Sequence, residues 1–141
     1  MGKVVIQEPH AYSFKANYQI RISDLNYGNH LSNDKVLAMA QEVRMMWLSS
    51  LGFSELDFFG VSLIQGDSAA IYKSEGFYAN DIEIQIGVMD LSNSSFDIVY
   101  KMYNKTTEKD LALVKTRMVC FDYNIRKVQG IPEKFRNLTV L

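Results

Sequence analysis

The segment Arg21-Ile22-Ser23-Asp24-Leu25-Asn26-Tyr27-Gly28-Asn29-His30-Leu31-Ser32-Asn33-Asp34 decides how this chain folds, because a strand pattern runs into it and a helix pattern runs out of it. From the end of the strand pattern to the first residue of the helix the segment holds a carboxylate, three carboxamides, a glycine and a histidine. Polar groups gathered at the start of a helix commonly bind an oxyanion, because free N–H groups and the helix dipole favour negative charge there.

The residues before and after this segment have different periodicities. Residues 13–22 alternate between apolar and polar side chains, which predicts a half-buried antiparallel strand. Residues 25–29 read as a turn. Apolar residues then recur every three or four positions, which predicts a helix over 33–51 that ends before Gly52. This helix is apolar over much of its circumference, so a second surface, such as another subunit, is expected to cover part of it.

The second half of the chain reads as strands joined by short turns. Residues 61–73 are extended with an interruption at Gly66, and alternating segments follow at 82–88, 96–102 and 111–123. Consecutive hairpins make an antiparallel sheet. We therefore predict one α+β domain over residues 1–141, with an antiparallel sheet wrapped around one long central helix. The core is expected over about 12–124, and residues 125–141, which contain Pro132, are expected to form an irregular tail.

Composition and charge narrow the function classes. The 141 residues carry a net charge of −1, which offers no basic face for nucleic acid. The single cysteine, Cys120, rules out an intrachain disulfide and a cysteine cluster for zinc, and no metal site is expected. No apolar run approaches the ~18 residues of a membrane span, and the N-terminal apolar run is too short for a signal peptide. We expect a soluble, cytoplasmic protein that binds neither membranes nor nucleic acid.

The motif resembles the opening of the hotdog-fold acyl-CoA thioesterases related to 4-hydroxybenzoyl-CoA thioesterase. That opening reads approximately R-x-x-D-x-D-x-x-G-H-V-N-N, followed by a helix with E-x-R. Here Arg21, Asp24, His30 and Asn33 match it, and Glu42 with Arg44 matches the helix pattern. The resemblance covers roughly residues 14–135. It implies a hotdog fold, hydrolysis of an acyl thioester on coenzyme A or an acyl carrier, no cofactor, and a homodimer or a dimer of dimers with sites between subunits.

One departure from the family pattern bears directly on the reaction. Where relatives carry a second aspartate that attacks the thioester or activates water, this chain has Asn26. An amide cannot serve as a general base. The carboxylate or base could instead come from Asp24, from Glu42 on the helix, or from His30, since an imidazole ordinarily titrates near neutral pH. Asn26 would then orient water or the carbonyl.

We predict Asn26, His30, Asp24 and Glu42 as catalytic candidates, and Asn33, Gly28 and Tyr27 as substrate-binding residues. Four lysines could meet the phosphates of coenzyme A or simply lie on a solvated sheet: Lys73, Lys101, Lys105 and Lys115. Asn26 also leaves open a non-catalytic acyl-CoA-binding protein. A hotdog dehydratase or hydratase is a weaker alternative, because those enzymes resemble D-x-N-P-x-H and this segment has no proline.

Overall fold

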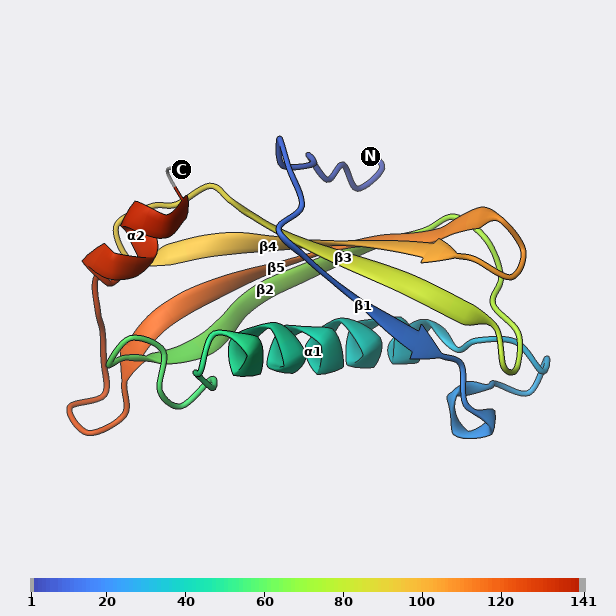
Figure 1. The fold of residues 1–141 in the computed structure, drawn as a ribbon, viewed down its shortest axis with the longest axis horizontal. Coiled ribbons are helices and arrows are strands. Elements are labelled where there is room, and N and C mark those ends of the chain that lie inside the picture. Colours follow the sequence, from blue (N-terminus) through green and yellow to red (C-terminus); the bar gives the residue numbers. More distant parts are fainter. Residues whose placement is uncertain (1, 140–141) are drawn as a thin grey trace.

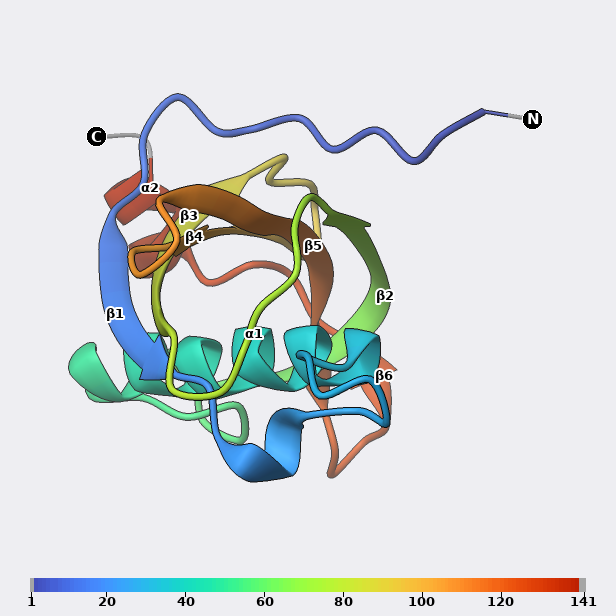
Figure 2. The ribbon, with the colours of Figure 1, turned by 90° about the vertical axis from the view of Figure 1, so that its right-hand side faces the viewer.

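A computed structural model describes residues 2–139, in which one helix lies along the concave side of a curved antiparallel sheet (Figures 1 and 2). The predicted architecture is therefore confirmed. The elements in chain order are β1 (Phe14–Gln19), a 3-10 turn (Ile22–Asp24), α1 (Asn33–Ser50), β2 (Ser62–Tyr72), β3 (Asp81–Met89), β4 (Ser95–Asn104), β5 (Lys109–Asp122), β6 (Lys127–Val128) and α2 (Glu133–Thr139).

The strand order is β1-β3-β4-β5-β2, with β6 paired to β5 beyond the start of β4. The hairpins β3–β4 and β4–β5 follow the predicted meander, and alternating side chains such as Ile82, Ile84 and Ile86 enter the core. Strands β1 and β2 form the two edges. No helix within residues 2–139 has both the length and the apolar character needed to cross a membrane.

The first strand is shorter than the alternation predicts. It ends at Gln19, and a 3-10 turn follows at Ile22–Asp24 that leaves Ile22 75% exposed. The turn forms because the carboxylate of Asp24 folds back, accepting hydrogen bonds from the backbone N–H of Arg21 at 2.9 Å and from the hydroxyl of Tyr18 at 2.7 Å. Two hydrogen bonds to a buried charge outweigh the burial of one isoleucine.

The central helix agrees with its prediction in extent but buries a slightly different face. Its buried residues are Val36, Met39, Ala40, Val43, Arg44, Trp47 and Leu48. Leu37, one of the apolar residues in the helical repeat, is 38% exposed, and Met45 and Met46 also face outward. The sheet covers only one side of α1, so an apolar strip on the outer side of the helix is left open.

The C-terminal segment contradicts the prediction of an irregular tail. Residues 127–128 form β6, and α2 begins directly after Pro132, whose fixed φ suits the first turn of a helix. The helix is held by Phe135, whose ring lies 4.7 Å from that of Phe58 and 4.8 Å from that of Phe96 between centroids. A helix this short is ordered by distant aromatic partners, which local periodicity does not reveal.

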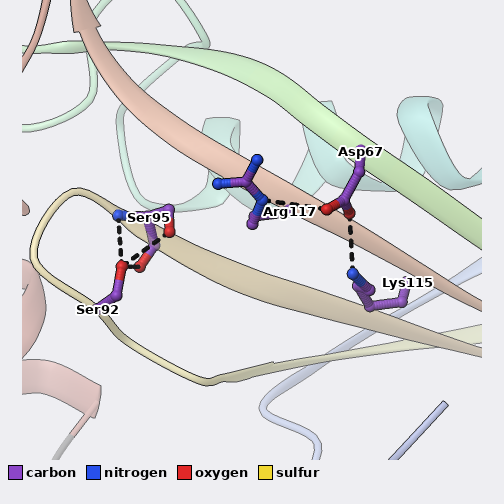
Figure 3. A network of polar contacts seen from close by, with 5 residues as sticks. All are labelled: Asp67, Ser92, Ser95, Lys115 and Arg117. Atoms are coloured by element: carbon purple, nitrogen blue, oxygen red, sulfur yellow. Dashed lines mark hydrogen bonds and ion pairs between the residues drawn. The ribbon is translucent and has the colours of Figure 1, made fainter.

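The interruption expected at Gly66 is a β-bulge, and an ion cluster lies on the convex face beside it (Figure 3). The carboxylate of Asp67 accepts from the ammonium of Lys115 at 2.8 Å and from Nε of Arg117 at 3.1 Å. A Cβ on Gly66 would lie 2.8 Å from Nη2 of Arg117, so glycine allows the guanidinium to cross the bulge. The cluster joins β2 to β5, and its exposure makes it worth little stability.

A buried polar network ties α1 to the inside of the sheet. Arg44 donates through Nε to Glu55 at 2.9 Å and through Nη1 to Gln65 at 3.3 Å and to the hydroxyl of Tyr100 at 3.0 Å. That hydroxyl also shares a 2.8 Å hydrogen bond with Thr116, and burial raises the pKa of Tyr100. Every member of the network has a partner, so the guanidinium can remain charged inside the core.

We expect Arg44→Ala to lower the free energy of unfolding by about 3 kcal/mol, because the substitution leaves Glu55 and Gln65 without their donor and opens a cavity. Chemical denaturation measured by circular dichroism would test this. Arg117→Ala is the matched control and should cost less than about 1 kcal/mol, since that arginine lies in an exposed ion pair. Equal losses for the two variants would contradict the structural role of the network.

Candidate active site

The loop at residues 26–30 is a short hairpin closed on the start of α1. Leu25 and Leu31 pair across it, and the N–H of Asn26 donates to the carbonyl of His30 at 2.9 Å. Asn29 takes a positive φ of 65°, which asparagine tolerates. The N–H of Ser32 then donates to the carbonyl of Asp24 at 2.9 Å, so the loop and the helix start are held together.

Asn26 organises this loop from within. Its Oδ1 accepts from the N–H of Gly28 at 2.9 Å and, more weakly, from that of His30 at 3.4 Å. The side-chain oxygen is therefore occupied by the turn, which leaves the NH2 group as the part of Asn26 that could contact a ligand. An asparagine suits this position as a turn residue whatever its role in chemistry.

His30 contacts a second segment of the chain, residues 75–77. It pairs with Phe77, and the two rings lie edge to face with centroids 6.4 Å apart. Its Nε2 lies 4.0 Å from Oε1 of Glu75, with the imidazole about one-third exposed. A Cβ on Gly28 would lie 3.0 Å from the same Nε2, so that glycine leaves room for the ring. A base and a carboxylate thus face each other across a partly open space.

The start of α1 carries free backbone donors. Ser32 caps the helix by its backbone only, and its hydroxyl donates to the carboxylate of Asp34, which lowers the pKa of that carboxyl. Within residues 2–139 the N–H groups of Asn33 and Asp34 have no backbone acceptor, but that of Asp34 faces its own carboxylate, which leaves the N–H of Asn33 as the donor beside the cavity. Such groups are suited to stabilise negative charge on a ligand.

A cavity of about 340 Å³ lies against this helix start. Its walls come from the helix start, from the end of β2 and the loop after it, and from the beginning of β5. They are lined by His30, Leu31, Asn33, Val36, Tyr72, Lys73, Ser74, Glu75, Gly76 and Leu111. The volume falls within the range of small-molecule sites, and the lining combines apolar walls with a few polar groups.

Asp24 is buried away from this cavity. Both of its side-chain hydrogen bonds, to Tyr18 and to the backbone of Arg21, are structural, and burial together with the bond to Asp24 raises the pKa of Tyr18. Asp24 therefore shapes the turn that precedes the site. Nothing places its carboxylate against the cavity lining.

Three other predicted residues also lie outside the lining. Glu42 pairs with Arg21 at 3.3 Å on the solvent side of α1. Tyr27 is fully exposed at the loop tip, and Gly28 lies beneath the imidazole. Of the seven residues predicted for the site, the cavity brings together His30 and Asn33, with Asn26 shaping the adjoining loop.

A family model described as the thioesterase-like superfamily matches residues 20–138. The chain belongs to this superfamily. No curated protein sequence matches it significantly.

Solved thioesterase structures share the fold at low identity. A 1,4-dihydroxy-2-naphthoyl-CoA thioesterase from Synechocystis has a TM-score of 0.80 and 18% identity, over 90% of this chain and 95% of that one. A thioesterase-superfamily protein from Jannaschia sp. has a TM-score of 0.82 and 16% identity, over 94% and 84%. A gentisyl-coenzyme A thioesterase has a TM-score of 0.76 and 14% identity, over 87% and 99%.

The residues that sequence reasoning missed in this thioesterase-like protein come from the connection after β2. Glu75, Ser74 and Tyr72 lie opposite His30 and Asn33, although some 40 positions separate the two segments. No local pattern marks Glu75, because a glutamate in a polar loop is ordinary. Of the four lysines considered for phosphate contacts, only Lys73 lines the cavity; the others meet Glu8, Asn17 and Asp67.

We expect Asp24→Ala to lower the free energy of unfolding by about 2 kcal/mol, because it leaves the buried hydroxyl of Tyr18 and the N–H of Arg21 without an acceptor. Asp24→Asn retains an acceptor oxygen and is the matched variant, with a smaller loss. Urea denaturation would measure both. If Asp24→Ala were as stable as the parent chain, the anchoring role of this carboxylate would be wrong.

Proposed function

We propose that the protein hydrolyses acyl-CoA thioesters in the cavity at the start of α1. The observation that carries the proposal is the convergence of three groups on one cavity: the backbone N–H of Asn33 at the start of α1, the imidazole of His30 and the carboxylate of Glu75. Membership in the thioesterase-like superfamily supports this reaction class. Two structural neighbours act on aromatic acyl-CoA compounds, so aromatic acyl groups are a first choice of substrate to test.

In the proposed reaction Glu75 is the general base. A water molecule held between Glu75 and His30 gives a proton to the carboxylate while its oxygen attacks the thioester carbonyl carbon. The negative charge that develops on the carbonyl oxygen is stabilised by the N–H groups at the start of α1. Collapse of the tetrahedral intermediate breaks the C–S bond, and the departing thiolate takes the proton from Glu75, which leaves the free acid and coenzyme A.

Lys73 is the proposed contact for a phosphate of coenzyme A. Its side chain lines the cavity, and it has no ion-pair partner within 4.0 Å among the described residues. A lysine serves phosphate as a flexible point charge at the rim of a site.

We further propose that the working unit is a homodimer joined through the edge strand β2, with a dimer of dimers as an extension. Strand β2 is an 11-residue edge strand with no partner strand on its outer side among the described residues, although the N–H of Leu63 near its start donates to the carbonyl of Glu55 at 2.7 Å. The open apolar strip on α1, with Leu37, Met45 and Met46, is a further surface for a neighbouring subunit to cover.

Glu75→Gln should reduce kcat/KM for acyl-CoA hydrolysis about 10²-fold or more, because the amide cannot accept the proton of water. His30→Ala should cause a comparable loss. A thiol-reactive dye that reports released coenzyme A, applied over aliphatic and aromatic acyl-CoA substrates, would measure both variants. Glu83→Gln, on the convex face of β3, is the matched control and should retain full activity. Full activity in Glu75→Gln would remove Glu75 from the mechanism.

Lys73→Ala should raise KM for acyl-CoA roughly tenfold with little change in kcat, because a phosphate contact is made equally in the ground and transition states. A substrate truncated to the acyl-pantetheine thioester lacks the nucleotide phosphates, and its KM should be the same for the parent chain and the variant. An unchanged KM for the full acyl-CoA would contradict the phosphate contact.

Binding without hydrolysis is the second candidate, and Asn26 favours it. In the family that the motif resembles, this position carries a catalytic carboxylate. Here it holds an amide whose oxygen accepts a hydrogen bond from the N–H of Gly28 in the same loop. An acyl-CoA that binds to the parent chain in calorimetry, but yields no coenzyme A over hours with any acyl group, would support this candidate against the thioesterase.

A further inference from the structure

The N-terminal segment crosses the convex face of the sheet and is fastened there by residues 8–13, here called the strap. The N–H of Ser13 donates to the carbonyl of Ile86 at 2.9 Å. Pro9 and Ala11 pack on Gly87, where a Cβ would lie 2.4 Å from Cγ of Pro9. Glu8 accepts from the hydroxyl of Tyr12 at 2.6 Å and pairs with Lys101 at 3.7 Å. The strap is therefore a packed part of the fold.

Residues 2–7, here called the arm, continue from the strap and leave the domain. Figure 2 shows the arm running above the sheet toward the β2 side and ending beyond β2, farther out than any other element there. Ile6 is partly buried, but Val4 is 54% and Val5 83% exposed. The arm makes no hydrogen bond with any other described residue. Val4 and Val5 are therefore the apolar side chains of the arm that their own chain leaves largely uncovered.

The arm passes the edge formed by β2, which is one of the two edges of the sheet. Beyond Leu63, whose N–H donates to the carbonyl of Glu55, the outer side of strand β2 has no partner strand among the described residues. Two copies can pair such strands antiparallel about a twofold axis. The surface beyond that edge is then the convex face of the second copy. On that face the register places Ile64 opposite Val119 and Ile71 opposite Leu113, on the same side as the Asp67 ion cluster. Ile64, Ile71 and Val119 are only partly buried.

We propose that the arm is exchanged between two copies of this chain, so that Val4 and Val5 of each copy pack on the convex face of β2 and β5 of the other. A twofold dimer makes the exchange mutual, with two identical contacts added to the β2 pairing. The proposal shares the dimer with the proposed function and is independent of the thioesterase reaction. It assigns the exposed valines and the partly exposed isoleucines to one interface, whose burial would stabilise the dimer.

The test measures the dimer dissociation constant by sedimentation velocity over a concentration series. Deletion of residues 2–7 and the pair Val4→Asp with Val5→Asp should each raise that constant at least tenfold. Gly87→Val should also raise it, because the new side chain displaces Pro9 and with it the strap that aims the arm. Leu138→Asp is the matched control and should change nothing, since Leu138 is equally exposed but lies on α2, away from β2 (Figure 2).

A second measurement locates the arm directly. Val5→Cys labelled with a photoreactive maleimide, in dimers mixed from isotopically light and heavy chains, should cross-link between chains to residues 62–72 or 113–121; Cys120 is buried and should not compete for the label. Dimers of unchanged affinity after deletion of the arm, or cross-links only within one chain, would overturn the exchange alone. A parent chain that stays monomeric at every concentration would overturn both the exchange and the proposed dimer, without bearing on hydrolysis.

Discussion

The burial of one face of α1 in the concave side of the sheet determines where the start of that helix lies, and the rest of the site depends on that position. Val43 and Leu48 are fully enclosed, and Arg44 fastens the same face through Glu55 and Tyr100. Because the helix is anchored along its length, its first N–H groups are held beside the connection between β2 and β3. A helix free to shift would not keep those donors aimed at one cavity.

Two buried charged residues, Asp24 and Arg44, hold the two parts of the chain between which the loop of the site lies. Asp24 holds the turn before the loop, and its carbonyl receives the N–H of Ser32 at the helix start. Arg44 holds the helix against the sheet. Neither group needs to meet a ligand, and each is satisfied by partners inside the fold. The loop at 26–30 lies between these anchors, so its conformation is determined before any substrate binds.

Features encoded by local periodicity could be predicted from the sequence. The alternation around Ile84 and the spacing along α1 reflect which side chains are buried, so the strands, the helix and the antiparallel sheet follow from them. Features that depend on distant contacts could not be predicted. Phe135 orders α2 through aromatic partners elsewhere in the chain. The carboxylate of Asp24 turns the chain after Gln19, although the alternation of apolar and polar side chains continues to Ile22.

Only one of the two segments that form the site could be predicted, for the same reason. His30 and Asn33 lie in one segment with a recognisable pattern, whereas Glu75 and Lys73 arrive from a loop brought in by the return of β2. The most direct test of this two-sided site is a crystal structure with a non-hydrolysable acyl-CoA analogue. We expect the carbonyl oxygen of the analogue to lie within hydrogen-bond distance of the N–H groups at the start of α1. Glu75 and His30 should lie on the side from which water attacks the carbonyl carbon. An analogue seated elsewhere, such as along Met45 and Met46, would contradict it.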